Sequence, residues 1–422
     1  MFKPRLIYTS LLWLLLPYVF FHLLWRARKQ PEYLQHIPER FGFYTAKSDQ
    51  PVIWLHTVSV GETRAAASLV QRLQVAYPGH QLLLTHTTPT GREASEQLYG
   101  DRVMRVYLPY DYPFAVKRFL RHFKPQVGVL LETEIWPNLI HQCHSDNIPL
   151  LLLNARLSEK SFARYARFPN LSLASLSQLH AVSAQTEEDA SRLRKLGARN
   201  IAVMGNLKYD IEPPPALLTI GKQLRNLFGS DRPVFLAAST REGEEELLLQ
   251  ALKQLDVPGL LTVIVPRHPQ RFDEVAALLT KQNFAFQRRS ENRPVAPQTQ
   301  LVLGDSMGEM FGYYAACDIA FIGGSLLPYG GQNLIEACAV GKPVIIGPHT
   351  YNFTEASNLA VYGGAAMRVK DASGLVTTLQ ELLAHPQRMA AMGEAGLAFV
   401  KANQGATDRA MAIIAQIMSG LK

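Results

Sequence analysis

The strongest constraint on the fold is an alternation of short apolar runs with amphipathic stretches that continues along most of the chain. Seven apolar runs lie between residues 52 and 206: VIWLHTV, QLLLTHTT, VMRVYLP, VGVLLE, PLLLLNA, QLHAVSA and IAVMGN. Each run has the length of one buried strand, and the stretches between them place apolar residues at helical spacing. Strands that alternate with helices predict a parallel sheet with helical crossovers.

Three consecutive prolines, Pro213 to Pro215, interrupt this alternation, because proline continues neither a helix nor a central strand. Five further apolar runs follow them: PVFLAAS, LLTVIVP, TQLVLGD, CDIAFIGG and KPVIIGP. At 422 residues the chain also exceeds one ordinary hydrophobic core. We therefore predict an α/β protein with domains at 26–212 and 213–422 that face one another across a cleft. The helical pattern from Gln387 onward is expected to pack back across that cleft.

The N-terminal segment LIYTSLLWLLLPYVFFHLLW, residues 6–25, carries no formal charge and is long enough to cross about 30 Å of hydrocarbon. A signal peptide normally has an apolar core of about 7 to 15 residues and a small-residue cleavage site, which FHLLWRARKQ lacks. We predict that residues 1–25 form a membrane anchor. Basic residues flank it on both sides, so the bias toward a cytoplasmic body is slight. Pro17 and His22 leave a helix lying in the membrane surface as the alternative.

The formal net charge of +8 is concentrated in the N-terminal half of the chain. A basic half suits anionic lipid or a phosphorylated substrate, whereas nucleic-acid motifs are not evident, so nucleic acid is not an expected partner. The cysteines are far apart and lack disulfide or metal-ligand spacing, which favours a reducing compartment: Cys143, Cys317 and Cys338. Three histidines are isolated, so no bound metal is expected: His56, His86 and His349.

One carboxylate stands out in the stretch VSVGET, where Glu62 follows Gly61 at the change from an apolar run to a helical pattern. In open parallel sheets such turns line the ligand-binding crevice, so Glu62 is a candidate general base. The alternative is an acid that only stabilises the first turn of its helix. The stretch LLETEIWPN places Glu132 and Glu134 at a second turn of this kind, with helix capping or pairing with an arginine as the alternative.

Three stretches of the C-terminal half indicate an anion site. In VPRHPQR, Arg267 and His268 follow a wholly apolar strand and suit an anion, with pairing of Arg267 to a neighbouring acid as the alternative. LGDSMGEM has two glycines that permit close backbone approach. The segment GGSLLPYGGQNLIEACAVGKPVIIGP has glycines at 323, 324, 330 and 331 ahead of a helix expected to start near Gln332. Free N–H groups at that helix start would bind an anion, and Glu336 would accept hydrogen bonds from a ribose diol. A helix-dipole or ion-pair role is the alternative for Glu336.

Eleven stretches together resemble the Kdo (3-deoxy-D-manno-octulosonic acid) transferase family of lipopolysaccharide synthesis. They occur in the same order as in that family and span about residues 41–353. They are FGFY, WLHTVSVGET, LLTHTTPTGRE, YLPYDYP, LLETEIWPN, NARLSEKSFARY, GNLKYD, AASTREGEEE, PRHPQRF, GDSMGEM and GGSLLPYGGQNLIEACAVGKPVIIGPHTYNF. The resemblance implies a GT-B glycosyltransferase, with two Rossmann-like domains and a cleft between them. It implies an N-terminal acceptor-binding domain and a C-terminal domain that binds CMP-Kdo.

The implied reaction transfers Kdo from CMP-Kdo to the tetra-acylated, phosphorylated lipid A precursor (lipid IVA). It would be a metal-independent inverting displacement, without a cofactor, at the cytoplasmic face of the inner membrane. The resemblance assigns the base to Glu62, and Gln332 stands where the family usually has histidine. It assigns CMP contacts to nine residues: Pro266, Arg267, Met307, Gly308, Glu309, Asn333, Leu334, Ile335 and Glu336.

Two stretches are candidates for the acceptor phosphates, VKRFLRHFK at 116–124 and RLSEKSFARYAR at 156–167, with a solvated helix face as the alternative for each. Two other functions stay open. One is a GT-B transferase or epimerase that uses a UDP-sugar, since a glycine loop with a ribose-binding glutamate does not distinguish CMP from UDP. The other is a catalytically silent, membrane-attached sugar-nucleotide binder.

Overall fold

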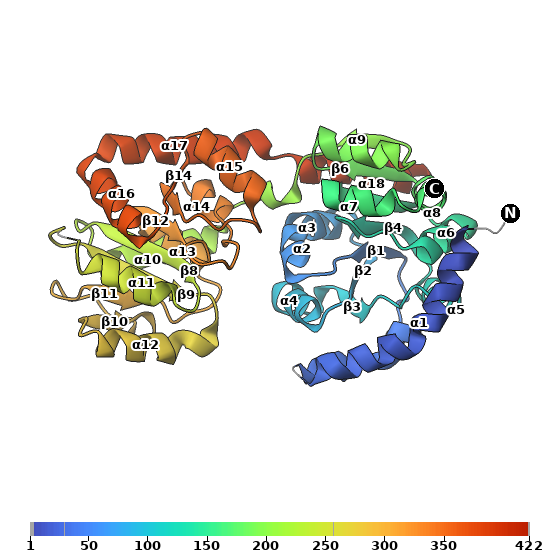
Figure 1. Cartoon of the computed structure of the whole chain (residues 1–422), viewed down its shortest axis with the longest axis horizontal. Coiled ribbons are helices and arrows are strands. Elements are labelled where there is room, and N and C mark those ends of the chain that lie inside the picture. The colour runs from blue at the N-terminus through green and yellow to red at the C-terminus, as the bar shows by residue number, and fades with distance from the viewer. Residues whose placement is uncertain (1–3, 29, 256, 421–422) are drawn as a thin grey trace. The chain divides into compact units, whose positions relative to one another are not determined.

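The computed structural model describes residues 4–28, 30–255 and 257–420. The chain divides into two compact units, unit 1 with residues 1–210 and 404–422, and unit 2 with residues 211–403. Each unit is built on a parallel sheet with helices around it (Figure 1). The predicted α/β class is therefore confirmed.

Unit 1 holds a sheet whose described strands follow the order β3-β2-β1-β4-β5-β6-β7. The strands correspond to the seven apolar runs: β1 (Val52–His56), β2 (Gln81–His86), β3 (Met104–Tyr107), β4 (Pro125–Leu131), β5 (Leu150–Ala155), β6 (Ala181–Ala184) and β7 (Ile201–Val203). The order reverses between β1 and β4, where Trp54 pairs with Gly128. A Cβ at Gly128 would lie 2.6 Å from the Trp54 ring, so the large indole and the glycine are packed against each other.

Alternate residues of each strand enter two separate cores on the two faces of this sheet. Trp54 belongs to one core, and its neighbours Ile53 and Leu55 belong to the other. The first core is covered by α5 (Pro113–Phe123), α6 (Pro137–Ser145), α8 (Pro169–Leu176) and α9 (Glu187–Lys195). The second is covered by α3 (Ala67–Ala76), α4 (Pro89–Tyr99) and α18 (Ala406–Gly420). Burial on both faces explains why the strands are continuous apolar runs.

The C-terminal helix α18 belongs to unit 1 although unit 2 precedes it in the chain. Asp210 accepts hydrogen bonds from the backbone N–H groups of Gly405, at 2.7 Å, and Thr407, at the start of the helix. Arg409 Nε donates to the carbonyl of Met204 at 2.7 Å. These bonds join the segment that follows β7 to the returning chain.

Unit 2 repeats the plan with the described strand order β10-β11-β9-β8-β12-β13-β14. The strands are β8 (Val234–Thr240), β9 (Leu261–Pro266), β10 (Phe286–Arg288), β11 (Leu301–Leu303), β12 (Ile319–Ile322), β13 (Val344–Ile346) and β14 (Ala366–Arg368). Its helices are α10 (Pro215–Phe228), α11 (Glu244–Leu252), α12 (Phe272–Lys281), α13 (Met310–Ala316), α14 (Ile335–Ala339), α15 (Thr354–Tyr362), α16 (Ala372–Ala384) and α17 (Pro386–Asn403). The prediction missed β10 and β14, because each consists of three residues that include an arginine, FQR and AMR, and so forms no apolar run.

The N-terminal helix α1 (Pro4–Ala27) runs along the outside of unit 1 (Figure 1). By length and composition it is long and apolar enough to cross a membrane. The predicted apolar helix is thus present. Two short 3-10 turns, Pro31–Leu34 and Ile37–Phe41, connect it to the sheet.

Candidate active site

Glu62 lies in the first turn of α2 (Val60–Ala65), directly after β1. The backbone N–H of Val58 donates to Glu62 Oε2 at 2.6 Å, and Ser59 Oγ donates to Oε1 at 3.1 Å. Ser59 in turn caps the helix by accepting from Glu62 N at 3.3 Å. This is a variant of the capping box, whose S-x-x-E pattern is readable in the sequence. Glu62 therefore has a structural role, which does not exclude a catalytic one.

The environment of Glu62 changes its acidity. Its side chain is buried, and burial raises the pKa of Glu62 from 4.5 to about 7, with the negative charge of Glu132 as the next contribution. The hydrogen bond from Val58 acts in the opposite direction but is outweighed. A carboxyl group that titrates near neutrality can accept a proton during a reaction, as a general base must.

The acids Glu132 and Glu134 follow β4, the strand beside β1. Their turn and the turn of Glu62 therefore both lie where the strand order of unit 1 reverses. Such a reversal is where open α/β sheets bind ligands. Glu132 has a left-handed backbone, with φ of 62°, and its Oε1 lies 3.4 Å from Lys208 Nζ. Glu134 Oε2 accepts from Trp136 Nε1 at 2.6 Å and lies 3.7 Å from His56 Nε2.

Neither acid caps the helix that follows it, which removes that alternative. The cap of α6 is Asp111, whose carboxylate accepts from the N–H groups of Asn138, at 2.9 Å, and Leu139, at 2.8 Å. The sequence did not identify Asp111, because it lies 27 residues before Asn138, the nearer of the two residues whose N–H groups it binds.

The histidines near these acids are buried and hydrogen-bonded. His86 Nδ1 lies 3.1 Å from Thr57 Oγ1, and burial lowers the pKa of His86 to about 3, so the ring is neutral. His56 Nδ1 lies 2.9 Å from Thr85 Oγ1. Within the described ranges, no group of three or more histidine, cysteine or acidic side chains is arranged to hold a metal ion.

In unit 2 the glycine segment differs from the prediction, because α14 begins at Ile335 and not near Gln332. The N–H groups of Gly331 and Gln332 donate to the carbonyls of Gly324, at 2.7 Å, and Gly323, at 3.0 Å. These two N–H groups therefore bond within the loop and are not free to bind an anion. Asn333 organises the short helix instead, since its Oδ1 accepts from Ile335 N at 3.1 Å and its Nδ2 donates to Glu336 Oε1 at 3.1 Å.

Glu244, at the start of α11, holds this glycine loop and was missed by the sequence reasoning. Its carboxylate accepts from the N–H groups of Gly324, at 2.5 Å, Leu326, at 2.9 Å, and Arg241, at 2.9 Å. The side chain is fully buried, and burial raises the pKa of Glu244. The only sequence signal was the acidic run GEEE after a strand, which does not reveal a partner 80 residues away.

A positively charged region forms at the end of β9. The pKa of His268 is lowered by burial and then by the charges of Arg241, Arg267 and Arg271. Arg271 is paired with Glu245, at 2.7 Å. Arg267 Nε donates to Gln332 Oε1 at 3.3 Å, which joins the Pro266–Arg267 corner to the segment 332–336. The arrangement favours an anionic ligand through arginine side chains.

At the predicted CMP contacts 307–309, the acidic side chain already has partners within unit 2. Glu309 is paired with Arg289, at 3.3 Å, and accepts from Ser306 Oγ at 2.7 Å. Met307 is exposed, and Gly308 has a left-handed backbone with φ of +79°.

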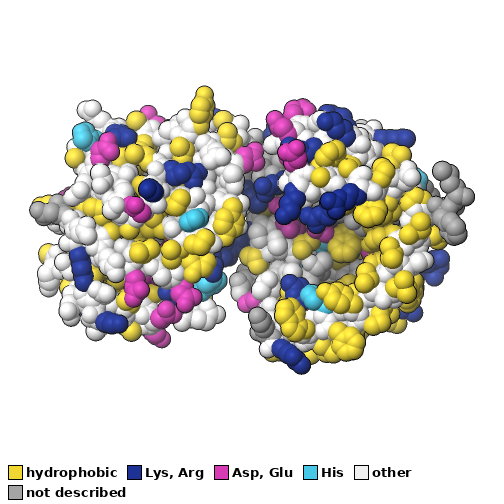
Figure 2. Space-filling view, in the orientation of Figure 1, with side chains coloured by type: hydrophobic (Ala, Val, Ile, Leu, Met, Phe, Trp, Pro, Cys, Tyr) yellow, Lys and Arg dark blue, Asp and Glu magenta, His cyan; other side chains and the backbone are white. Residues whose placement is uncertain are grey.

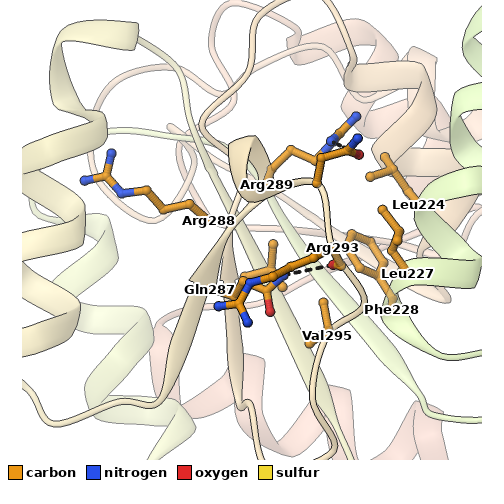
Figure 3. A pocket seen from close by; sticks show the side chains of 10 residues that line it. Leu224, Leu227, Phe228, Gln287, Arg288, Arg289, Arg293 and Val295 are labelled. Atoms are coloured by element: carbon orange, nitrogen blue, oxygen red, sulfur yellow. Dashed lines mark hydrogen bonds between the residues drawn. The ribbon is translucent and has the colours of Figure 1, made fainter.

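Arg289 also lines a small pocket, where Gln287 Nε2 donates to the carbonyl of Arg293 at 2.9 Å (Figure 3). The pocket is lined by Leu224, Leu227, Phe228, Gln287, Arg288, Arg289, Asn292, Arg293, Val295 and Val302. Arg288 points away from it (Figure 3). None of the predicted donor contacts is among these lining residues.

Comparison with known proteins places these features in context. The family described as "3-Deoxy-D-manno-octulosonic-acid transferase (kdotransferase)" matches residues 35–211, and "Glycosyl transferases group 1" matches residues 229–398. The chain is 42% identical to the 3-deoxy-D-manno-octulosonic acid transferase of Bordetella pertussis, with 96% of this chain and 98% of that protein covered. It is 40% identical to the Haemophilus influenzae enzyme of the same name, with 97% and 98% covered.

A solved structure shares the fold. The crystal structure of a glycosyltransferase from Rickettsia africae ESF-5 matches with a TM-score of 0.59 at 16% identity, covering 88% of this chain and 99% of that one. At that identity the likeness concerns the fold alone. Together with the two parallel sheets, it confirms the predicted GT-B class.

Proposed function

The chain belongs to the 3-deoxy-D-manno-octulosonic acid transferase family, and we propose that it transfers Kdo from CMP-Kdo to the tetra-acylated lipid A precursor, lipid IVA. Membership rests on full-length identity of 42% and 40% to the two named transferases. The structural observation that carries the chemistry is Glu62, a buried carboxylate whose pKa is raised to about 7 beside Glu132.

In the proposed displacement, an acceptor hydroxyl attacks the anomeric carbon of Kdo. Glu62 takes the hydroxyl proton as the new carbon–oxygen bond forms, and the bond from that carbon to the phosphate oxygen breaks. CMP leaves with the bonding electrons, so negative charge develops on its phosphate, and the configuration inverts. Arginine side chains stabilise this charge without a metal.

Unit 2 is the proposed donor domain. Arg267 holds the phosphate, in the region where Arg241 and Arg271 also place positive charge. Glu336, oriented by Asn333, accepts from the ribose hydroxyls. The remaining proposed CMP contacts are Pro266, Leu334, Ile335, Met307, Gly308 and Glu309. Because Glu309 is already paired with Arg289, its proposed contribution is to shape the site around Gly308.

Unit 1 is the proposed acceptor domain, and the contacts favour the stretch 156–167 for the acceptor phosphates. Four basic side chains there are exposed, and none of them has a salt bridge within the described ranges: Arg156, Lys160, Arg164 and Arg167. The hydroxyl of Thr133 donates to the carbonyl of Arg156, which ties this stretch to the loop of Glu132 and Glu134. Glu134 and Arg164 both act on the pKa of Tyr165 in α7 (Glu159–Tyr165), which burial raises.

The other candidate for the acceptor phosphates, the stretch 116–124, lies away from Glu62 and Glu132. Arg118 stacks over the ring of Phe43, 4.2 Å from its centre. The helix α5 ends beside the first residue of β4, and His122 Nε2 lies 2.6 Å from the carbonyl of Ala46. The last turn of α5 therefore lies at the end of the sheet opposite to Glu62 and Glu132.

We propose that the chain works at the inner membrane with its body on the cytoplasmic side. The apolar helix α1 supports attachment to a membrane. The three cysteines are free and buried, which is compatible with a reducing compartment.

Mass spectrometry of lipid IVA incubated with CMP-Kdo and the purified chain tests the proposal. A product heavier by one or more Kdo residues is expected. In parallel, release of the nucleotide from CMP-Kdo and from UDP-sugars distinguishes this enzyme from another GT-B transferase or epimerase. Turnover of a UDP-sugar with none of CMP-Kdo would overturn the proposal, and absence of any turnover would favour the silent binder.

A further inference from the structure

We propose that α1 lies in the plane of one membrane leaflet, docked on unit 1, and does not cross the bilayer. This inference rests on the proposed membrane location but not on the proposed chemistry. It is carried by polar contacts at the start of α1, which would be lost if the helix crossed.

The first third of α1 is hydrogen-bonded to residues far away in the sequence. Arg5 Nη1 and Thr9 Oγ1 both donate to Asn138 Oδ1, at 3.1 and 3.0 Å. Tyr8 donates from its hydroxyl to Asp111 Oδ2 at 3.0 Å. We call this set of five residues, Arg5, Tyr8, Thr9, Asp111 and Asn138, the α1 latch.

The two latch residues that lie outside α1 are buried and hydrogen-bonded within unit 1. Asp111 and Asn138 are buried, with exposed fractions of 3% and 2%. Asn138 Nδ2 also donates to the carbonyl of Asp111 at 2.7 Å. Losing the latch would leave buried polar groups short of partners, which is costly.

Ring and backbone contacts continue the docking one turn further along. Tyr112 donates from its hydroxyl to the carbonyl of Leu12 at 2.8 Å. The Trp13 ring lies 5.2 Å from Tyr112 and 5.6 Å from Phe114, measured between ring centres. The start of α1 therefore packs against the same region of unit 1 as the latch.

The opposite end of α1 also contacts unit 1. Leu23 and Ala27 are buried in a small cluster with Tyr33, and Ile37 packs against it. Arg26 stacks over the Tyr33 ring, 4.9 Å from its centre. The next residues enter the body through Arg40, whose carbonyl accepts from Tyr110 N at 2.9 Å.

These two sets of contacts decide the topology. A helix of 24 residues is about 36 Å long, so a spanning α1 would place its two ends on opposite sides of the hydrocarbon. Arg5 would then lie across the bilayer from Asn138. Because both ends contact unit 1, a docked α1 has both ends on the side of the body.

The exposed surface of α1 fits the apolar part of a leaflet. Ten of its large hydrophobic side chains and Tyr18 are each at least 40% exposed: Leu6, Ile7, Leu11, Trp13, Leu14, Leu15, Tyr18, Phe20, Phe21, Leu24 and Trp25. Figure 2 shows hydrophobic side chains gathered along this helix. Trp and Tyr prefer the membrane interface, and Arg26 and Arg28 at its end suit anionic headgroups.

Cysteine labelling tests the topology. The full-length chain carries either Pro4→Cys, at the start of α1, or Asp49→Cys, an exposed position on the body. A membrane-impermeant maleimide is applied to inverted inner-membrane vesicles and to spheroplasts. The native cysteines give little background, because all three are at most 1% exposed. Both introduced cysteines should react in inverted vesicles and neither in spheroplasts. Labelling of Pro4→Cys only in spheroplasts would show a spanning helix and overturn the proposal.

Vesicle flotation tests whether a membrane covers the exposed apolar side chains of α1. The variant Leu14→Lys with Phe21→Lys should float with anionic phosphatidylglycerol vesicles about tenfold less than the parent chain. The matched control, Val75→Lys with Tyr362→Lys, adds the same charge at exposed sites outside α1 and should float normally. Unchanged flotation of the first variant would refute the proposal, as would a dimer in solution that these substitutions dissociate. Activity on detergent-dispersed lipid IVA stays normal in both variants, so failure here is distinguishable from failure of the proposed reaction.

Discussion

Replacing Glu62 with glutamine separates its proposed catalytic role from its role in capping α2. Glutamine keeps the size of the side chain and an oxygen that accepts from Val58 N–H, a bond of 2.6 Å in the parent chain. It removes the ability to take a proton. General bases contribute about 10² to 10⁴-fold in rate, or about 3 to 5 kcal/mol of barrier. We therefore expect kcat to fall by that factor, with CMP binding to unit 2 nearly unchanged.

The same substitution, which should lower the rate, should raise the stability of the folded chain at high pH. The pKa of Glu62 is raised from 4.5 to about 7 in the folded chain, so the unfolded chain loses this proton first as the pH rises. The contribution of Glu62 to stability is complete below about pH 4.5 and is lost as the pH rises through about 7. At pH 8 the folded state then carries a cost of up to about 3.5 kcal/mol, at about 1.4 kcal/mol per pKa unit.

Thermal unfolding and steady-state kinetics measure both effects. Glu62→Gln should match the parent in stability near pH 4.5 and exceed it at pH 8. The kcat/KM of the parent should rise with pH through about 7, because the base must be deprotonated, and the variant should lack this limb. Near-normal turnover of the variant would show that Glu62 only caps its helix. Loss of CMP affinity together with turnover would instead indicate a wider structural defect.

Four further changes have distinct expected outcomes. Glu132→Gln removes a charge that raises the pKa of Glu62, so the acid limb of kcat/KM should move to lower pH; an unmoved limb would contradict the coupling. Arg267→Ala should lower kcat/KM for CMP-Kdo roughly ten- to a hundredfold, since one charged contact to phosphate is worth about 1.5 to 3 kcal/mol, and unchanged donor dependence would place the phosphate elsewhere. Glu244→Ala leaves the N–H groups of Gly324 and Leu326 without their acceptor, so a drop in Tm of several degrees and weaker donor binding are expected by calorimetry. A chain truncated before Arg26 should retain activity on detergent-dispersed acceptor; an inactive but folded truncation would assign α1 more than attachment.

The sequence identified most of the sheet because its strands are buried on both faces. All seven strands of unit 1 coincide with apolar runs, and these are local properties of the chain. Glu62 was identifiable for the same reason, since a strand-to-helix turn is local, and the S-x-x-E pattern at Ser59 also lies within four residues. The resemblance of eleven stretches indicated the family that the comparisons show.

Other features were decided only by contacts between distant residues. Two N–H groups of the glycine loop donate to carbonyls within the loop, and two more donate to Glu244. Glu244 lies 80 residues before Gly324 and 82 before Leu326. The latch joins α1 to residues 103 to 133 positions away, and the apolar pattern of residues 6–25 alone fits a spanning helix equally well. Burial and the charge of Glu132 set the acidity of Glu62. The linear sequence shows which residue types are present and their local periodicity. Hydrogen-bond partners and desolvation depend on which distant groups the fold brings together.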